Sequence, residues 1–306
     1  MTEVIEAVGL TKSYGTRRGI IDVDFAVRSG EVFGFLGPNG AGKTTTIRTL
    51  LGLLRPTSGR ATVFGLDVWV DAPRVHEQIS FLGSDPGYLG ELTAAEQLDY
   101  VARLRRLPRD AWRPTAERFE LDPTVPIKKL SRGNRQKVGV VQAFMGEPPL
   151  LILDEPTTGL DPLMQREFLA VLSEVRAAGR TVFLSSHNLP EVERSCDRVG
   201  IIREGRLTQI ATVQALLASH WRSVNLVLGR PPAAGTFDLP NVEVASMTAR
   251  DVHLMVRGDV NPLLRRIAEL DVYDVSITTP EIEDVFLRFY EGTEAPHPEM
   301  VAEVTR

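Results

Sequence analysis

The segment GPNGAGKTT, residues 37–45, constrains the fold of this chain more than any other stretch. It follows the apolar run GEVFGFLG at 30–37 and precedes KTTTIRTLLGLL at 43–54, whose apolar residues recur at helical spacing. The segment fits G-x-x-x-x-G-K-[ST], placed between a strand and a helix as that pattern requires. Its glycines let the backbone curl so that consecutive N–H groups surround a phosphate. We therefore expect an α/β fold that holds phosphates at the N-terminus of a helix.

Nine consecutive residues of this loop are candidates for contact with ATP. Lys43 would bring a positive charge to the β- and γ-phosphates, and the Thr44 hydroxyl would bind Mg²⁺. A glycine-rich turn without a nucleotide is the alternative, which the order of strand, loop and helix disfavours. The candidate residues are Gly37, Pro38, Asn39, Gly40, Ala41, Gly42, Lys43, Thr44 and Thr45.

The segment LLILDEP, residues 150–156, is an apolar strand that ends in two adjacent carboxylates. In a parallel sheet the strand ends converge where phosphates bind. Asp154 is then placed to hold Mg²⁺ through water, and Glu155 to polarise an attacking water. A solvated acidic turn is the alternative, and the phosphate loop in the same chain makes it less favoured.

Strand and helix patterns alternate along the first 215 residues. Strand patterns lie at 4–10, 20–27, 30–37, 61–68 and 79–82, and in LLILDEP and TVFLSSH. Helical patterns lie at 43–54, 93–120 and 131–145, and in PLMQREFLAVLSEVRAAG and LPEVERSCD. Thr93 and Glu96 have the spacing of a capping box. This alternation predicts a mainly parallel sheet flanked by helices.

The composition changes after about residue 215. The stretch RPPAAGTFDLP at 230–240 is rich in proline and glycine, which is typical of a loop or linker. Beyond it, NVEVASM, DVHLMVRG and DVYDVSITT resemble strands, and NPLLRRIAEL and PEIEDVFLRFY resemble helices. We expect a small α+β appendage, followed by a poorly ordered polar tail.

Composition restricts the classes of function. The net charge of −5 argues against nucleic acid as the main partner, because surfaces that bind phosphate backbones are usually basic. The single cysteine, Cys196, allows no intrachain disulfide, favours a reducing compartment and is expected to pack as a small apolar residue. The N-terminus lacks the pattern of a signal peptide, and no apolar run reaches membrane-spanning length. A membrane role would therefore need a partner.

The phosphate loop, LSRGN, LILDEP, GLDP and SSHN follow one another in this chain, and in this order they resemble the nucleotide-binding subunit of an ABC transporter. The resemblance covers about residues 4–215. It implies a P-loop NTPase core of the ABC type at 1–219, with a helical subdomain at about 84–145. The appendage lies outside this resemblance and is expected to be an accessory domain at 220–292, followed by a disordered polar tail at 293–306.

The resemblance also implies roles for individual residues. Tyr14 matches the aromatic that stacks on adenine, and His187 the histidine that contacts the γ-phosphate. Asp161 matches the residue that links two ATP sites. Ser131 and Gly133 would cap an ATP held by a second subunit, so a homodimer or a heterodimer with a related subunit is implied. The alternatives are local packing for Tyr14, an ordinary polar strand end for His187, and helix N-caps for Asp161 and Ser131.

Three positions depart from the family pattern. Arg132 stands where glycine is usual, and Asn134 where glutamine is usual. Ser84 stands where the family has a glutamine that helps to bind Mg²⁺ and senses the membrane partner. Serine is too short to span that distance, although Asp85 or a water could substitute. Slower or more partner-dependent hydrolysis is the expected result.

The segments GPNGAGKTTTIRTLLGLLRPTSG and PEIEDVFLRFY resemble ATPase subunits of drug and antibiotic exporters. For the appendage, a generic extension that stabilises a dimer is the alternative. The implied function is ATP hydrolysis that powers efflux of a drug, antibiotic or other hydrophobic compound through a separate membrane-spanning permease. The protein would lie at the cytoplasmic face of the membrane.

An importer subunit is the nearest alternative. A soluble ABC ATPase acting on nucleic acid or ribosomes is less favoured, because a second ATPase core, a long coiled coil and zinc-binding cysteines are absent. A kinase or GTPase switch is disfavoured because N-K-x-D is absent and LSRGN and SSHN have no role there.

Overall fold

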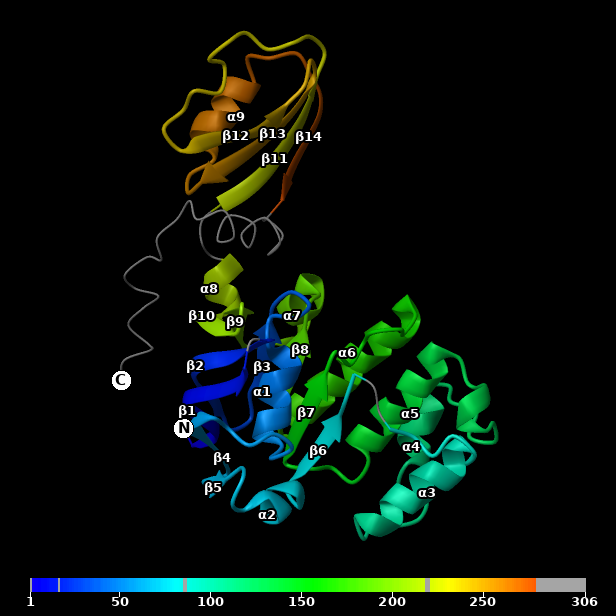
Figure 1. Cartoon of the computed structure of the whole chain (residues 1–306). Helices are drawn as coiled ribbons and strands as arrows, with labels where there is room; N and C mark the ends of the chain where they lie inside the picture. Colours follow the sequence, from blue (N-terminus) through cyan, green and yellow to red (C-terminus); the bar gives the residue numbers. More distant parts are fainter. Residues whose placement is uncertain (1, 16, 85–86, 218–220, 279–306) are drawn as a thin grey trace. The chain divides into compact units, whose positions relative to one another are not determined.

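The computed structural model describes residues 2–15, 17–84, 87–217 and 221–278 (Figure 1). The chain divides into two compact units, Met1–Ala211 and Thr212–Arg306. The predicted tail at 293–306 and the predicted helix PEIEDVFLRFY lie outside the described residues, as does Asp85.

A six-stranded sheet forms the centre of the first unit. Its strand order is β10-β9-β3-β8-β7-β6, and the pairs β9/β3, β3/β8, β8/β7 and β7/β6 are parallel. All residues of β3, β7 and β8 are buried, as expected for parallel strands covered on both faces. The six strands are β3 (Val32–Leu36), β6 (Ile79–Leu82), β7 (Leu150–Asp154), β8 (Thr181–Ser186), β9 (Arg198–Arg203) and β10 (Arg206–Thr212).

A second, antiparallel sheet was not anticipated from the alternating pattern. It contains β1 (Glu3–Tyr14), β2 (Arg17–Arg28), β4 (Ser58–Val63) and β5 (Leu66–Asp67), in the order β2-β1-β4-β5. Only two residues separate β1 from β2, so the strands pair as a hairpin, whereas a parallel pair needs a longer crossover. The predicted parallel sheet is therefore one of two sheets in this unit.

An aromatic cluster joins the two sheets. Phe25 of β2 lies 5.8 Å from Phe33 and 5.6 Å from Phe35 of β3, measured between ring centroids. It lies 5.7 Å from Phe183 of β8. Such spacings give favourable ring contacts in addition to the burial of large apolar surfaces. The cluster fixes β3 and β8, and with them the loops that follow both strands.

Helices flank the sheets and form a separate subdomain. Figure 1 shows α3, α4 and α5 gathered on one side of the first unit. They enclose a core of their own around Leu98, Trp112 and Val141. The predicted capping box is confirmed, because Thr93 and Glu96 exchange both hydrogen bonds at the start of α3. The helices of the first unit are α1 (Lys43–Leu50), α2 (Ala72–His76), α3 (Ala94–Leu104), α4 (Arg113–Arg118), η1 (Ile127–Lys129), α5 (Arg132–Phe144), α6 (Pro162–Ala177) and α7 (Leu189–Ser195).

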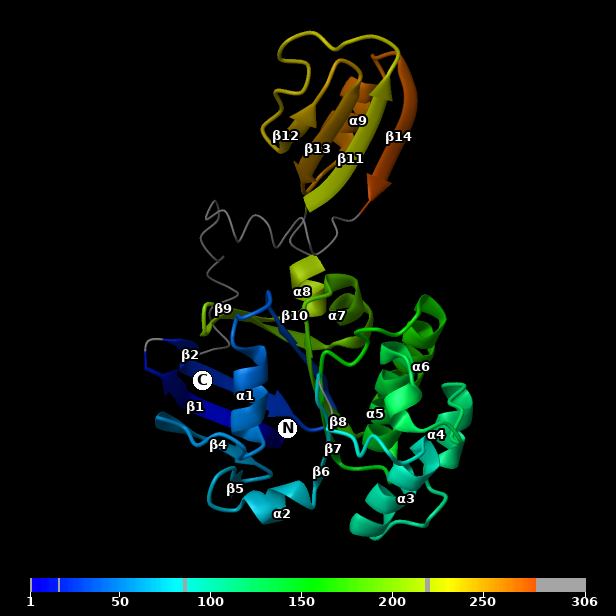
Figure 2. The same ribbon diagram turned by 45° about the vertical axis from the view of Figure 1, so that its right-hand side comes forward.

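The second unit begins with α8 (Val213–Leu217) and contains a four-stranded antiparallel sheet in the order β12-β13-β11-β14. Figure 2 shows α9 against one face of this sheet, where Leu263 and Ile267 join its apolar core. The predicted strands and helix here are confirmed as β12 (Val242–Met247), β13 (Asp251–Arg257), α9 (Asn261–Ile267) and β14 (Val272–Thr278). The strand β11 (Trp221–Leu228) was not predicted. Within the described ranges, no helix has both the length and the apolar character needed to cross a membrane.

Candidate nucleotide-binding site

The predicted phosphate loop connects β3 to α1. Gly40 and Gly42 have positive φ angles of 79° and 114°, which glycine adopts without steric cost. At Gly37 a Cβ atom would lie 2.3 Å from the Ile202 carbonyl oxygen, so only glycine fits against β9 there. The cavity beside the loop has a volume of about 350 Å³. Its lining residues are Gly19, Asn39, Gly40, Gly42, Lys43, Thr44, Thr45, Ser84 and Glu155.

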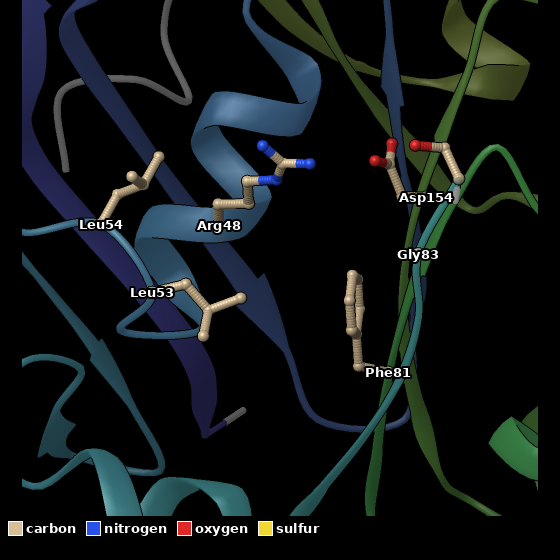
Figure 3. Close-up of a pocket in the computed structure, with 7 residues that line it drawn as sticks. Arg48, Leu53, Leu54, Phe81, Gly83 and Asp154 are labelled. Carbon is tan, nitrogen blue, oxygen red and sulfur yellow. The ribbon is translucent and has the colours of Figure 1, made fainter. Parts of the chain in front are cut away.

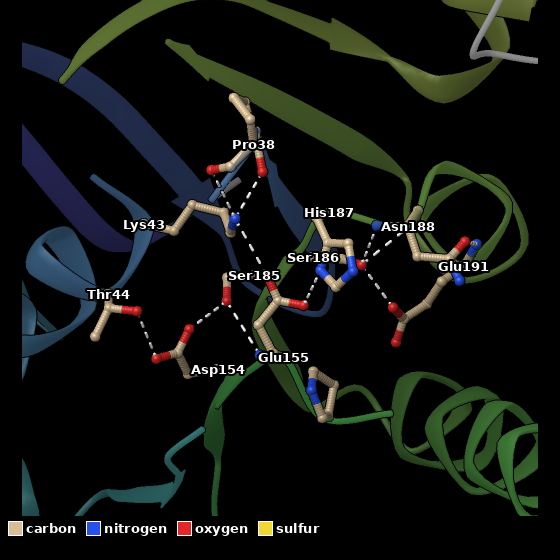
Figure 4. Close-up of polar contacts among 12 residues, drawn as sticks. Pro38, Lys43, Thr44, Asp154, Glu155, Ser185, Ser186, His187, Asn188 and Glu191 are labelled. Carbon is tan, nitrogen blue, oxygen red and sulfur yellow. Dashed lines mark hydrogen bonds and ion pairs between the residues drawn. The ribbon is translucent and has the colours of Figure 1, made fainter. Parts of the chain in front are cut away.

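Lys43 is buried at the centre of this site (Figure 4). Its Nζ donates hydrogen bonds to the Gly37 carbonyl at 2.6 Å and the Pro38 carbonyl at 3.2 Å. It also forms an ion pair with Glu155 Oε1 at 3.2 Å. The loop carbonyls and one carboxylate therefore orient a positive charge at the wall of the cavity. A charge held in this way is suited to bind phosphate oxygens.

Asp154 and Thr44 meet next to the loop. Asp154 is only 1% exposed, and its two carboxylate oxygens accept from Thr44 Oγ1 at 2.9 Å and Ser185 Oγ at 2.6 Å. A hydroxyl and a carboxylate side by side are the oxygen donors that Mg²⁺ prefers. Among the described residues, no group of three His, Cys, Asp or Glu side chains could hold a metal ion. The Thr44 hydroxyl and the Asp154 carboxylate fit Mg²⁺ that takes its remaining ligands from phosphates and water.

Glu155 begins the loop after β7 with an unusual backbone conformation. Its φ is 53°, a left-handed value that costs of the order of 1 kcal/mol or more for a residue with a side chain. The Glu155 N–H donates to the Ser185 carbonyl and to Ser185 Oγ, both at 3.2 Å. Its carboxylate contacts Lys43 and lies 2.6 Å from His187 Nδ1 (Figure 4). The carboxylate is thus held beside the phosphate loop, where it could polarise a water.

The signature residues and Asp161 occupy helix N-termini, and both capping predictions are confirmed. Ser131 Oγ accepts from the Asn134 N–H at 3.2 Å at the start of α5. Asp161 Oδ1 accepts from the N–H groups of Met164 and Leu163 at 3.0 Å each at the start of α6. These bonds lower the pKa of Asp161, that from Met164 most strongly. Ser131 and Asp161 are exposed, so each can cap its helix and still meet another molecule.

Tyr14 and Ser84 lie at the edge of the arrangement. Tyr14 is 42% exposed and does not line the cavity, but its ring lies next to Gly19, which does. Ser84 lines the cavity and is exposed. Ser84 also lines an adjoining cavity of about 370 Å³, shown in Figure 3. The other lining residues of that cavity are Arg48, Leu53, Leu54, Phe81, Gly83 and Asp154.

Three polar residues at the site were missed from the sequence. Ser185 binds Asp154 and the Glu155 N–H. Gln136 donates from Nε2 to the Pro156 carbonyl at 2.9 Å. Glu191 accepts from Ser186 Oγ at 2.6 Å, and burial raises its pKa to about 7. Ser185 lies within the SSHN pattern and could have been found there, whereas Gln136 and Glu191 look like ordinary polar helix residues.

Comparison with known proteins agrees with this geometry. A family model described as ABC transporter matches residues 20–158. The bacitracin transport ATP-binding protein BcrA of Bacillus licheniformis is 33% identical over 303 residues, which is 95% of this chain and 99% of BcrA. The probable multidrug ABC transporter ATP-binding protein YbhF of Escherichia coli is 37% identical over 221 residues, which is 70% of this chain and 38% of YbhF.

Solved structures show the same likeness. The structure of an ATP-binding subunit of an ABC transporter is 34% identical, with a TM-score of 0.65, and the match covers 70% of this chain and 91% of that one. The dimeric structure of a post-hydrolysis state of the ATP-binding cassette MJ0796, bound to ADP and Pi, is 20% identical, with a TM-score of 0.64. That match covers 68% of this chain and 98% of the cassette and supports the fold.

Proposed function

Because this chain belongs to the family of ABC transporter ATP-binding proteins, which hydrolyse ATP to drive transport, we propose that it powers the export of a drug, antibiotic or other hydrophobic compound. The observation that carries the catalytic part is the position of Glu155 beside the phosphate loop, held by Lys43 and His187. The export direction is supported by the bacitracin and multidrug relatives, whose similarity extends over 95% and 70% of this chain.

The phosphate loop would bind the ATP phosphates through its backbone N–H groups and Lys43. Because Lys43 is already ion-paired with Glu155, the arriving phosphates would compete for its charge and leave Glu155 free to engage water. Tyr14 would stack on adenine, which its exposed ring beside the cavity-lining residue Gly19 supports.

Mg²⁺ would be held by the Thr44 hydroxyl and by Asp154, directly or through water. When bound, it supplies positive charge that stabilises the charge developing on the phosphates. Glu155 would accept a proton from the attacking water, and His187 would contact the γ-phosphate from the end of β8. Ser185 would hold the Asp154 carboxylate and the Glu155 backbone in fixed positions relative to each other.

Ser131 and Gly133 would cap the ATP bound by a second subunit. Ser131 is exposed at the N-terminus of the thirteen-residue helix α5, where free N–H groups and the helix dipole favour an anion. The chain carries one phosphate loop and one signature segment, so two complete sites require a second subunit, identical or related. The solved cassette of similar fold that is described as dimeric supports this arrangement.

A separate membrane-spanning permease would complete the transporter at the cytoplasmic face of the membrane. The adjoining cavity of Figure 3 is the surface that we assign to it. Leu53 is 57% exposed there and, with Phe81, offers an apolar surface to a partner. Asp154 and Ser84 line the same cavity, so a segment seated in it would contact the neighbourhood of the Mg²⁺ ligands.

The catalytic assignment is tested with Glu155→Gln, which keeps the shape of the side chain and removes its basicity. We expect turnover to fall by about 10² to 10⁴ while ATP binding changes little. Phosphate release measures turnover, and a fluorescent ATP analogue measures binding. The exposed residue Glu77 provides the control variant Glu77→Gln, which should behave as wild type. Full turnover by Glu155→Gln would show that the base lies elsewhere.

The transport assignment is tested by co-purification with a candidate permease, followed by assays in sealed inside-out vesicles. ATP-dependent accumulation of an antibiotic such as bacitracin inside these vesicles would support export. Loss of a preloaded solute from the vesicles on addition of ATP would instead indicate an importer. The Glu155→Gln complex should assemble but move nothing in either direction.

A further inference from the structure

We propose that Gln136 couples the two ATP sites of the dimer by joining the signature end of α5 to the backbone of Glu155 in the same chain. The inference rests on the proposed dimeric ATPase function and adds a positioning residue to it. Ser131 and Gly133 of one subunit would meet the ATP of the partner, whereas Glu155 of that subunit acts on its own ATP. A rigid link between α5 and Glu155 would therefore connect the two nucleotides.

The link is visible in the contacts of Gln136. This side chain comes from the helical subdomain and is only 7% exposed. Its Nε2 donates to the Pro156 carbonyl at 2.9 Å, with a longer contact of 3.5 Å to the Glu155 carbonyl. One amide from α5, the helix that precedes β7, thus holds the carbonyl groups of Glu155 and Pro156.

Glu155 needs such a restraint because of its backbone conformation. A left-handed φ of 53° persists in a glutamate only when the surroundings enforce it. On its N-terminal side Glu155 is bound to Ser185 of β8, which belongs to the central sheet. On its C-terminal side the Glu155 carbonyl accepts from the Thr158 N–H at 3.2 Å, within the loop itself. Gln136 adds the 2.9 Å bond to the Pro156 carbonyl and the longer contact to the Glu155 carbonyl. The position of the base thus depends on both the sheet and α5.

The first turn of α5 packs against the same loop. A Cβ atom at Gly133 would lie 2.6 Å from the Gly159 carbonyl oxygen, so the two backbones are in close contact. The Arg132 side chain also lies alongside Gly159. Gly133 precedes Gln136 by three residues, a spacing that places both on one side of the helix. A displacement of the signature residues would therefore be carried to residues 155–159.

The consequence is a specific form of cooperativity. When a partner's ATP draws Ser131 and Gly133 into place, α5 takes a defined position and Gln136 fixes Glu155 in its own site. Each ATP would then be hydrolysed efficiently only when the other is bound. Hydrolysis should rise with ATP concentration with a Hill coefficient above 1, and approaching 2 for two sites.

The test compares Gln136→Leu with Gln142→Leu, a control on the same helix that has no described contact with residues 155–159. Steady-state phosphate release is measured against ATP concentration, and thermal melting confirms folding. For Gln136→Leu we expect a Hill coefficient near 1 and a kcat about tenfold lower. ATP-dependent dimerisation, measured by light scattering in the Glu155→Gln background, should be unchanged. Gln142→Leu should keep the cooperativity of the wild type.

Gln136→Glu provides a second test, whose expected result would not follow if Gln136 had only a structural role. An ionised carboxylate cannot donate a hydrogen bond, whereas a protonated one has a single O–H that can donate to the Pro156 carbonyl. Its rate relative to wild type should therefore rise as the pH is lowered, whereas the relative rate of Gln136→Leu should stay flat. If neither variant changes the Hill coefficient, or if Gln142→Leu lowers it equally, the inference is wrong. If the Glu155→Gln protein alone forms no ATP-dependent dimer, the homodimer on which this inference is tested fails instead.

Discussion

Glu191 gives the sharpest prediction about stability, because it is a carboxyl group buried beside the site. It lies on α7, only 6% exposed, and its Oε2 accepts from Ser186 Oγ at 2.6 Å. Burial raises its pKa to about 7, and the charge of Glu155 adds to this effect. The pKa of Glu191 is lowered by hydrogen bonds from the hydroxyls of Ser186 and Thr157 and by the neighbouring His187, but by less than burial raises it. The variant Glu191→Gln replaces this group with a neutral one of the same shape.

The magnitude follows from the difference between the ordinary glutamate pKa of 4.5 and a value of about 7 in the folded protein. At 1.36 kcal/mol per pH unit, this difference corresponds to about 3 kcal/mol. Because the folded pKa is the higher one, the contribution of Glu191 to stability is fully present below pH 4.5. It is lost progressively as the pH rises through about 7, where the buried carboxylate becomes charged.

Glu191→Gln stays neutral throughout this range, so the variant and the wild type should differ little at pH 5. At pH 8 the variant should be more stable by about 3 kcal/mol, which corresponds to a melting temperature higher by about 6–12 °C for a unit of this size. Thermal melting followed by circular dichroism from pH 5 to 9 gives the melting temperatures of the variant and the wild type at each pH. Glu193→Gln, on the same helix but less buried, is the control and should show no such trend. A difference that does not grow with pH, or that favours the wild type at pH 8, would refute the reasoning.

Two further variants probe the Mg²⁺ side of the site. Ser84→Gln restores the reach that serine lacks, and we expect several-fold faster basal phosphate release at limiting Mg²⁺, with less dependence on the permease. An unchanged rate and unchanged coupling would show that Ser84 has little consequence. Ser185→Ala removes a hydroxyl that binds both Asp154 and the Glu155 N–H, and we expect about 1–3 kcal/mol lower stability and about tenfold lower kcat. Chemical denaturation measures the stability of Ser185→Ala, and a Mg²⁺ titration of phosphate release measures its kcat. Wild-type values of both would contradict this prediction.

The sequence predicts best where chemistry dictates residue types at fixed spacing. The phosphate loop is found because Gly40 and Gly42 must adopt positive φ and Lys43 must lie at the start of α1. The strands β7 and β8 are found because burial on both faces makes them continuous apolar runs. The helix caps at Ser131 and Asp161 follow from local side-chain chemistry, which needs no knowledge of the tertiary structure.

Contacts between segments that are distant in the chain could not be predicted from the sequence. The strand β1 pairs with β4 across some fifty residues, and nothing local in either strand indicates this partner. The strand β11 is different, because from Val224 to Leu228 its residues alternate between buried and exposed, and this half-buried strand pattern could have been predicted from the sequence. Glu191 and Glu193 are equivalent by composition, and only the packing of α7 against the end of β8 buries the first of them.

Two of the three departures from the family pattern, at Ser84 and Arg132, have different structural meanings. Ser84 lines both the phosphate-loop cavity and the adjoining one, but its short side chain cannot carry a displacement from one to the other. Arg132, by contrast, packs along Gly159 and strengthens the contact between α5 and the loop after Glu155. Gln136 reaches the same loop from the next turn of that helix. The connection that we propose between the helical subdomain and Glu155 therefore runs through α5. In that proposal, a partner that moves this subdomain acts on Glu155 without a glutamine at position 84.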